Sequence, residues 1–329
     1  MVLAPLFIRK GIFMKKILAI MLMSAAMLMM GSCGDSGEVH LNFATGGVAG
    51  TYYPLGGAMA AVVNANTNIN LTVMSSGASG DNIRQIGVGD AHIAIAQNDV
   101  MRYAFTGTET WAELTPVTTF ATLMTLYPET VQIVVLADSG IYTVADLQGR
   151  RVSIGDIGSG VAANAVQVLA AYGLTTDDII VTHAGFGPSA DAMRDLTIDA
   201  FFVTAATPNT AVNELATARD LRILSLSESA IQQLLNDFAF YVRVTVDSSD
   251  GYTWLEGTVN TVAVQATLIA TTDLDDQVAY DIVRTLIERA SEIGHARGAY
   301  ITAHNAVQSV SVDFHPGARR FFQEIGVLD

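Results

Sequence analysis

The chain has 329 residues, a formal net charge of −15 and a hydrophobic content of 50%. This length and apolar content can build a large core and suggest two lobes. Four of the 17 basic residues and none of the 32 acidic ones precede Cys33, which leaves arginines but no lysine in the rest of the chain. The acidity argues against a nucleic-acid partner, which needs a basic face, and against an anionic lipid surface.

The N-terminus has the pattern of a secretory signal. Met14-Lys15-Lys16 is a basic start, residues 17–30 are apolar, and small residues precede Cys33. The apolar run is shorter than the ~20 residues that a membrane-spanning helix needs. We therefore expect residues 1–32 to be a signal peptide, with residues 1–13 an over-extended start.

The end of this signal resembles the lipobox of bacterial lipoproteins, in which the cysteine is acylated and becomes the mature N-terminus. Met30 stands where leucine is more usual, and Cys33 is the only cysteine, so it has no partner for an internal disulfide. We expect lipidation at Cys33, followed by a linker over 33–38. The alternative is an ordinary secretory signal with a coincidental cysteine.

The rest of the chain alternates strand-like and helix-like segments. Short apolar and β-branched runs predict strands at 39–43, 70–74, 92–96, 121–124, 131–136, 151–154, 179–183, 200–203, 221–224 and 259–266. Longer periodic runs predict helices at 58–63, 81–87, 99–105, 144–149, 161–172, 274–293 and 318–325. This alternation predicts an α/β fold with largely parallel sheets, in which ligands lie at the carboxyl ends of strands.

Residues 45–57 form a glycine-rich loop between the first strand and the first helix. Glycine lets the backbone approach a ligand closely, and the free N–H groups at the helix start favour an anionic group. Tyr52 and Tyr53 either offer flat surface with a hydroxyl at its edge, or pack at the helix start. The loop contains no base, nucleophile or metal ligand, so it predicts binding without catalysis.

Three further loops follow predicted strands. Residues 75–80 are small, Gln97 ends a strand, and Gly158-Ser159-Gly160 precedes a helix. Gln97 either contacts a ligand or caps the next helix, whereas the Gly158–Gly160 position favours anion binding over a purely structural turn. Residues 204–208 form a weaker fifth candidate.

Several of these motifs, in the same order, resemble the TAXI family, the extracytoplasmic substrate-binding proteins of one class of tripartite ATP-independent periplasmic (TRAP) transporters. The resemblance rests on residues 44–47 with 50–54, residues 76–79 with Asn82, residues 94–100, 145–155 and 158–160, residues 199–202 with Pro208, and residues 315–318. It implies a two-lobe periplasmic-binding-protein fold, type II-like, with the ligand cleft between the lobes. It also implies capture of a small organic anion, such as glutamate or a related amino acid or dicarboxylate, for delivery to TRAP permease subunits.

This combination predicts the organisation of the chain. We expect one lobe from 39–127 and 262–329, and the other from 132–260, with strands at 131–136 and 259–264 crossing between separate sheets. The ligand's carboxylate should face the backbone N–H groups of residues 159–161. The candidate ligand-binding residues are Thr45, Gly46, Thr51, Tyr52, Tyr53, Ser76, Gly77, Gln97, Gly158, Ser159, Gly160, Val161 and Pro208. Arg84 and Arg102, on the helices that follow, could reach in.

The sequence contains no pattern typical of an enzyme. None of the six histidines has metal-ligand spacing, and Gly158-Ser159-Gly160 lacks the spacing of a nucleophile elbow. The absence of lysine after the signal excludes P-loop and Schiff-base chemistry. We therefore predict a binding protein with no cofactor and no metal, in the periplasm or at the outer face of the cytoplasmic membrane, touching the membrane only through its anchor. The alternatives are an ABC-type periplasmic binding protein and, less favoured, an envelope enzyme.

Overall fold

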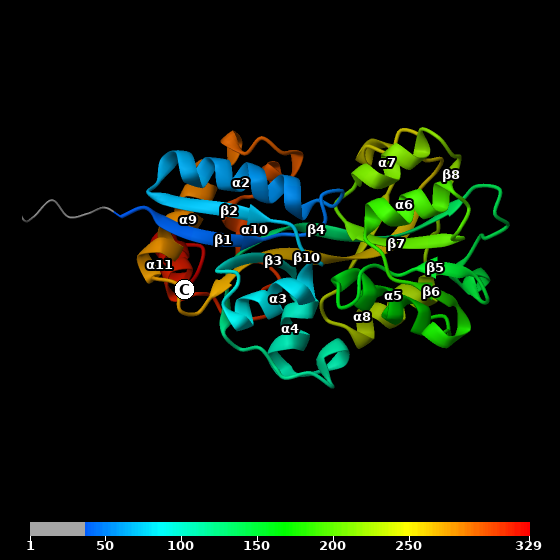
Figure 1. The fold of residues 1–329 in the computed structure, drawn as a ribbon, viewed down its shortest axis with the longest axis horizontal. Helices are drawn as coiled ribbons and strands as arrows, with labels where there is room; N and C mark the ends of the chain where they lie inside the picture. The colour runs from blue at the N-terminus through cyan, green and yellow to red at the C-terminus, as the bar shows by residue number, and fades with distance from the viewer. Residues whose placement is uncertain (1–36) are drawn as a thin grey trace, which may run out of the picture. The chain divides into compact units, whose positions relative to one another are not determined.

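The computed structural model describes residues 37–329, so the expected signal peptide and Cys33 lie outside the described residues. Residues 39–329 form one compact unit of alternating strands and helices (Figure 1). The strands are β1 (Val39–Ala44), β2 (Ile69–Met74), β3 (Ile93–Gln97), β4 (Phe120–Leu136), β5 (Arg151–Ser153), β6 (Ile180–Thr182), β7 (Ala200–Ala205), β8 (Leu221–Ile223), β9 (Val242–Val246) and β10 (Val259–Thr271). The α-helices are α2 (Tyr52–Asn66), α3 (Ser79–Val88), α4 (Asn98–Thr106), α5 (Gly160–Ala170), α6 (Phe186–Arg194), α7 (Thr210–Ala216), α8 (Glu228–Asp237), α9 (Asp276–Glu288), α10 (Ala303–Ala306) and α11 (Pro316–Glu324).

Two long antiparallel strands, β4 and β10, run through the middle of the unit. β4 has 17 residues and β10 has 13. The sheet order is β2-β1-β3-β10-β4-β7-β5-β6, with β8 paired to β4 and β9 to β10. Two of the predicted strands, 121–124 and 131–136, are parts of β4, because the ladder continues past Pro128 although this residue has no N–H to donate.

Two sequence-based expectations about the sheet are wrong. Hydrogen bonding is continuous through β4 and β10, so the strands form one sheet and not two separate ones. The sheet is also mixed, since β10 is antiparallel to β3, β4 and β9, and β4 is antiparallel to β7. Both differences have one cause: the crossing strands are long enough to pair with neighbours on both sides.

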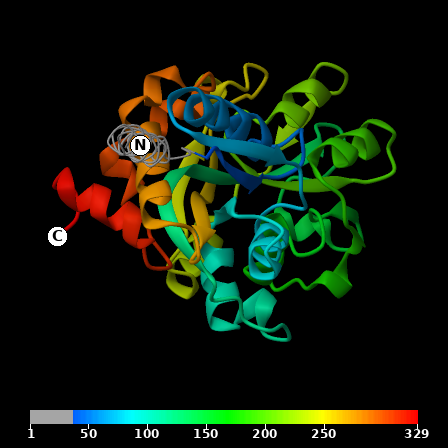
Figure 2. The ribbon, with the colours of Figure 1, turned by 60° about the vertical axis from the view of Figure 1, so that its left-hand side comes forward.

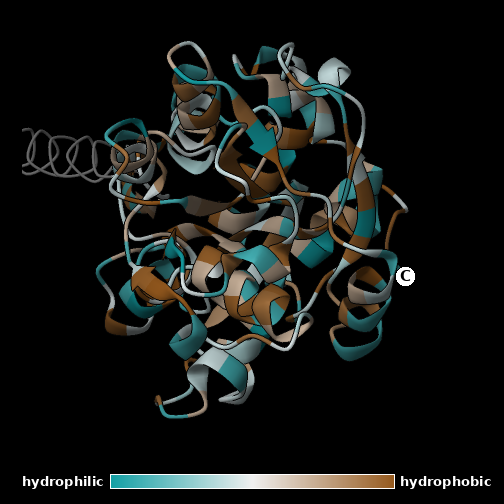
Figure 3. Ribbon diagram, turned by 90° about the vertical axis from the view of Figure 1, so that its right-hand side faces the viewer, coloured by the Kyte–Doolittle hydropathy of each residue, from teal (hydrophilic) through white to brown (hydrophobic). Residues whose placement is uncertain are grey.

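The buried apolar residues gather in four clusters, two on each side of the middle of the crossing strands. One pair of clusters is built mainly on β1, β2, β3, α2, α4 and α9, and includes Phe43, Met101 and Ile282. The other pair is built mainly on β5, β7, α5, α6 and α8, and includes Phe202 and Met193. Figure 3 shows the strands in predominantly apolar colours between helices of mixed polarity. Because the clusters divide into these two pairs, we propose a first lobe of residues 39–127 and 262–329 and a second lobe of residues 132–260.

Helices cover both faces of the sheet in the first lobe. In Figures 1 and 2, α2 lies on one face and α3 and α4 lie on the other. Helix α2 starts at Tyr52, six residues before the predicted run, which places Pro54 in the first helical turn where its missing N–H is harmless. This early start brings the glycine-rich loop and the helix N-terminus to the same place. Within residues 37–329, no helix combines the length and the apolar character that a membrane span needs.

Candidate functional site

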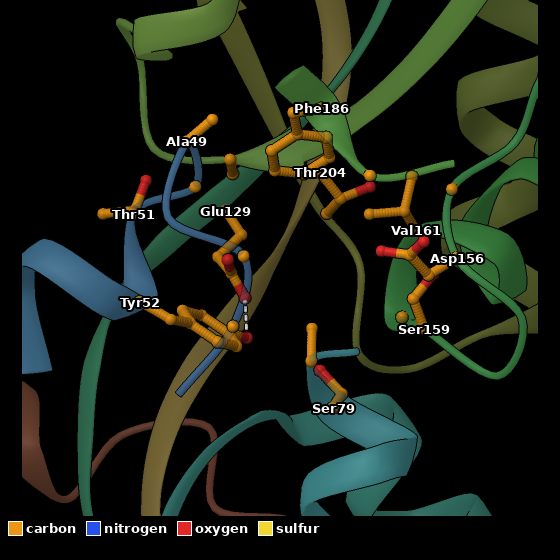
Figure 4. Close-up of a pocket in the computed structure, with 18 of the residues that line it drawn as sticks. Ala49, Thr51, Tyr52, Ser79, Glu129, Asp156, Ser159, Val161, Phe186 and Thr204 are labelled. Atoms are coloured by element: carbon orange, nitrogen blue, oxygen red, sulfur yellow. Dashed lines mark hydrogen bonds between the residues drawn. The ribbon is translucent and has the colours of Figure 1, made fainter. Parts of the chain in front are cut away.

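A cavity of about 320 Å³ lies between the two proposed lobes (Figure 4). The loop after β1 and the ends of β3, β5 and β7 reach it, as expected for an α/β sheet. Glu129 of the crossing strand β4 also lines it. The full lining consists of residues 46–52, 78–79, 97, 129, 155–156, 159–161, 185–188 and 204–205.

The structure brings about half of the predicted ligand-binding residues to this cavity. Those that line it are Gly46, Thr51, Tyr52, Gln97, Ser159, Gly160 and Val161. Those that do not line it are Thr45, Tyr53, Ser76, Gly77, Gly158 and Pro208. Whether either group contacts a ligand stays a prediction.

Three of the residues outside the lining have structural roles in the loops. The Thr45 hydroxyl donates a 2.7 Å hydrogen bond to the Met74 carbonyl, beneath the glycine-rich loop. The Ser76 hydroxyl donates to Asn82 Oδ1 at 2.5 Å, and the Gly77 N–H donates to Asp81 at 3.0 Å. These side chains and amides fix the shape of the loops whose backbones then line the cavity.

The remaining predicted contacts lie at the periphery. Tyr53 is half-buried outside the lining, and Pro208 is exposed. Gly158 has a φ of +75° and lies against the guanidinium of Arg84. That guanidinium lies 5.6 Å from the Trp111 ring centroid, and neither Arg84 nor Arg102 lines the cavity.

Tyr52 and Glu129 form a buried polar pair in the lining. The Tyr52 hydroxyl, in the first turn of α2, donates a 2.6 Å hydrogen bond to Glu129 Oε2. Burial raises the pKa of Glu129 to about 8, and this hydrogen bond opposes the rise in pKa. The carboxyl is therefore mostly protonated at neutral pH when the cavity is empty.

The N-terminus of α5 faces the cavity from the second lobe. Ser159 caps the helix by accepting the Ala162 N–H at 3.2 Å, and its own N–H donates to the Asp156 carbonyl at 3.0 Å. The N–H groups of Gly160 and Val161 have no carbonyl partner within the helix, as at every helix start. Both residues line the cavity, so this end can receive an anionic group.

Glycines allow the two lobes to meet beside the cavity. A Cβ atom on Gly160 would overlap Oε1 of Gln97, and a Cβ on Gly80 would overlap the carbonyl oxygen of Gly158. The Gln97 side chain is 2% exposed, and its Oε1 accepts no hydrogen bond. The contact of the lobes thus depends on the absence of side chains at two positions.

A buried hydrogen-bond network joins α4 to α5 on the far side of Gln97. Asn164 Nδ2 donates to Asp99 Oδ2 at 2.8 Å and lies 2.9 Å from the Tyr241 hydroxyl. Gln167 Nε2 donates to the Tyr103 hydroxyl at 2.9 Å. Burial raises the pKa of Asp99 to about 6, while hydrogen bonds from the Val100 N–H and from Asn164 lower it. This network connects the proposed lobes through buried hydrogen bonds.

Sequence reasoning missed three parts of the lining: Glu129, residues 155–156, and residues 185–188 with Phe186. A carboxylate two residues before the predicted strand 131–136 was the available signal for Glu129, because charged side chains are seldom buried beside a core strand without a partner. Phe186 had no such signal, since its position depends on how α6 packs on β7. Among the described residues, no group of histidine, cysteine, aspartate and glutamate side chains is arranged to hold a metal ion.

Solved structures with the same fold include periplasmic proteins. The alkanesulfonate-binding protein SsuA from Xanthomonas axonopodis pv. citri is 16% identical, with a TM-score of 0.50 over 87% of this chain and 83% of that chain. The periplasmic binding protein BugD is 12% identical, with a TM-score of 0.56 over 88% of this chain and 95% of that chain. A structure described as a periplasmic transporter is 12% identical, with a TM-score of 0.51 over 88% and 93%. At these identities the likeness concerns the fold, which is the two-lobe periplasmic-binding-protein fold.

The family is established by the sequence match. Residues 43–326 match the model of the NMT1-like family, from the end of β1 to the C-terminus of the last helix. This match covers both proposed lobes and every loop that lines the cavity. The chain belongs to the NMT1-like family.

Proposed function

We propose that this protein is an extracytoplasmic solute-binding protein, which captures a small organic solute in the cavity and delivers it to a membrane permease. The observation that carries the proposal is the cavity itself, which is lined from both proposed lobes and from the crossing strand. Its volume of about 320 Å³ suits a small metabolite. The lining offers hydrogen-bonding groups without a nucleophile paired to a base, so we propose binding without catalysis.

Transport requires two states of the receptor. The contacts of Gly160 with Gln97 and of Asn164 with Asp99 join the lobes beside the cavity. A solute that touches both lobes favours the form in which they meet, because it gains interactions there that the open form lacks. The permease would then distinguish loaded from empty receptor by the surface that closure creates.

The N-terminus of α5 indicates which chemical class of solute the cavity binds. The N–H groups of Gly160 and Val161 favour an acid group, which supports a small organic anion such as glutamate or a related amino acid or dicarboxylate. A site built from hydrogen bonds also suits a protein that must release its cargo, since a desolvated arginine pair is hard to break.

The type of transporter has two candidates. The reported comparisons fit an ABC-type periplasmic binding protein better than a TRAP receptor, because they comprise the NMT1-like family and periplasmic proteins such as SsuA, and none is named as a TRAP receptor. The TRAP candidate rests on the ordered TAXI-like motifs alone. Uptake of the solute in reconstituted vesicles separates the two: an ABC system requires ATP, whereas a TRAP system requires an ion gradient and no ATP.

We further propose that the protein works outside the cytoplasmic membrane, in the periplasm or at the membrane's outer face, held by a lipid at Cys33. The support is the signal-like and lipobox-like pattern at the N-terminus. The fold, shared with periplasmic binding proteins, is compatible with this location.

A thermal-shift screen tests the proposed function. The purified residues 37–329 are heated alone and with amino acids, dicarboxylates, hydroxy acids and sulfonates. A solute at 100 times its dissociation constant stabilises the folded state by about 2.7 kcal/mol, which raises the melting temperature measurably. The absence of a shift with every class, for a folded protein, would contradict solute binding.

A further inference from the structure

The lining of the cavity offers no cationic side chain. The lining contains the carboxyl groups of Glu129 and Asp156 and no arginine or histidine. Arg297, which approaches the second lobe, donates to the Thr207 carbonyl and lies 5.2 Å from the Tyr300 ring centroid. A ligand with two acid groups would therefore bring a second negative charge into a cavity with no cation to receive it.

The side of the cavity nearest β4 presents hydrogen-bond acceptors. Glu129 is 2% exposed and its carboxyl meets the Tyr52 hydroxyl there (Figure 4). Gln97 Oε1 and Thr204 Oγ1 also belong to lining residues and have no hydrogen-bond partner in the protein, but both are buried, and Gln97 Oε1 lies beside Gly160 on the α5 side of the cavity. Tyr52 occupies one acceptor site of this carboxyl, and a carboxylate can accept more than one hydrogen bond, so a ligand that donates hydrogen bonds is favoured beside Glu129. An ammonium group has three such donors.

The opposite side of the cavity presents donors. The 11-residue helix α5 begins there, and the N–H groups of Gly160 and Val161 have no partner within it. Figure 4 shows Ser159 and Val161 on the side of the cavity away from Tyr52. One acid group fits this end of the helix.

We propose that the ligand is a zwitterion with one ammonium group and one acid group, and that Glu129 receives the ammonium while the start of α5 receives the acid. This inference rests on the proposed function and narrows its substrate class. It makes Glu129 the residue that selects solutes with an amino group over hydroxy acids and dicarboxylates.

Proton release is a consequence of this arrangement. The groups that act on Glu129 are Tyr52 from α2, Tyr127 from β4 and the Asp99 carboxylate from α4, and none of them is a cation. An ammonium placed beside Glu129 favours the ionised carboxylate, so the proton of Glu129 passes to the buffer as the ligand binds. Because burial raises the pKa of the free carboxyl to about 8, this release approaches one proton per ligand near pH 7.

Matched pairs of solutes test the selectivity by isothermal titration of the wild-type protein. The pairs are an amino acid with the hydroxy acid of the same skeleton, such as L-leucine with L-2-hydroxy-4-methylpentanoate, L-glutamine with L-glutamate, and taurine with isethionate. We expect the neutral ammonium-bearing member of a binding pair to bind at least tenfold more tightly. The carboxylate and sulfonate pairs distinguish the two acid groups that the helix end could take.

The outcomes separate this inference from the proposed function. If a hydroxy acid or a dicarboxylate binds as tightly as its ammonium-bearing or neutral counterpart, the protein is a solute receptor but the assignment of Glu129 is wrong. If no solute of any class binds, both proposals are wrong.

Glu129→Gln tests the residue directly, because the amide has the same shape but neither the charge nor the acidic proton. We expect at least tenfold weaker binding of the amino acid, unchanged binding of any hydroxy acid, and loss of proton release. The number of protons released is the slope of the binding enthalpy against the ionisation enthalpy of the buffer. We measure it in phosphate and in Tris at pH 7. The control is Glu228→Gln, an exposed carboxylate paired with Arg243 at 2.6 Å outside the cavity. Equal affinity and equal proton release in wild type and Glu129→Gln would overturn the proposal, and if this variant does not fold, the solute pairs on the wild type decide.

Discussion

The hydroxyl of Tyr52 lies 2.6 Å from Oε2 of Glu129, 77 positions further along the chain. This hydrogen bond joins the start of α2 to the crossing strand β4 at the wall of the cavity. It ties the glycine-rich loop, which the sequence marks as a binding loop, to a carboxyl on the strand that runs between the proposed lobes. The pair is therefore both a structural support of the first lobe and a part of the candidate site.

Tyr52→Phe separates these two roles. Tyr52→Ala would leave Glu129 without its hydrogen-bond donor and would also create a cavity at a buried position. Its effect on solute affinity could then not be separated from its effect on folding stability. Loss of the hydroxyl alone should lower the free energy of unfolding by about 1–2 kcal/mol, since a buried acceptor loses its partner. It should also raise the pKa of Glu129 further, because the hydrogen bond favours the ionised form.

Urea denaturation and isothermal titration measure the two effects of Tyr52→Phe. Tyr53→Phe is the matched control, because Tyr53 is the adjacent residue and lies outside the lining. We expect Tyr52→Phe to weaken solute binding and Tyr53→Phe to leave it unchanged. The reverse order of effects would place the ligand on the other side of α2.

Glu129→Gln should change how stability depends on pH. The folded-state pKa of about 8 lies above the ordinary value of 4.5, so between these values the unfolded chain has lost a proton that the folded chain retains. The wild type therefore loses stability as the pH rises from about 4.5 to 8, by on the order of a few kcal/mol. Asp99, with a pKa of about 6, adds a slope of the same sign at lower pH in both proteins.

The measurement is urea denaturation of both proteins at pH 5, 6.5 and 8. We expect the advantage of Glu129→Gln over the wild type to grow with pH and to be largest at pH 8. Parallel pH profiles would show that Glu129 titrates normally and is not desolvated.

Alanine at Gly80 or Gly160 should interfere with closure more than with folding. Gly80 lies within α3, where alanine favours the helix by up to about 1 kcal/mol, yet its Cβ would overlap the Gly158 carbonyl of the other lobe. A Cβ on Gly160 would overlap Gln97 Oε1 in the same way. We expect at least tenfold weaker solute binding with little loss of melting temperature.

Isothermal titration and a melting curve for each glycine variant test this expectation. Gly57→Ala is the control, because Gly57 is also helical and a Cβ there meets nothing within 4 Å. If Gly80→Ala binds solute as the wild type does, the contact of the lobes is not required for binding.

Cys33→Ala should abolish the proposed anchor. With the cysteine removed, no fatty acid can be attached, and the protein should appear in the soluble or unprocessed fraction of the cell envelope. Cys33 lies outside the described residues, so the expectation rests on the sequence pattern alone. Metabolic labelling with a fatty acid and membrane fractionation measure the result, and unchanged labelling and fractionation of the variant would contradict lipidation at this residue.

Local sequence patterns predicted the backbone of the site better than its side chains. The turn before α5 was predictable because Gly158, Ser159 and Gly160 combine a positive φ, an N-cap side chain and a close approach within three residues. Thr45 and Ser76 lie in loops of the same kind, but their hydroxyls bond to Met74 and Asn82 and do not face the cavity. A loop motif fixes where the chain passes, whereas the direction of a side chain depends on the partners available beneath it.

Long-range features could not be derived from the sequence for the same reason. Glu129 reaches the cavity because β4 continues for 17 residues from one proposed lobe to the other, and this continuation depends on pairing with β10. The single mixed sheet has the same origin. The alternation of strands and helices indicated the α/β class. It carried no information about which strands would run through both proposed lobes.

A crystal structure of residues 37–329 with the best solute from the thermal-shift screen tests the proposed binding site most directly. We expect density for that solute between Glu129 and the first turn of α5, with its amino group on the Glu129 side and its acid group near the N–H groups of Gly160 and Val161. Density for the solute at a site that touches neither Glu129 nor α5 would contradict this expectation.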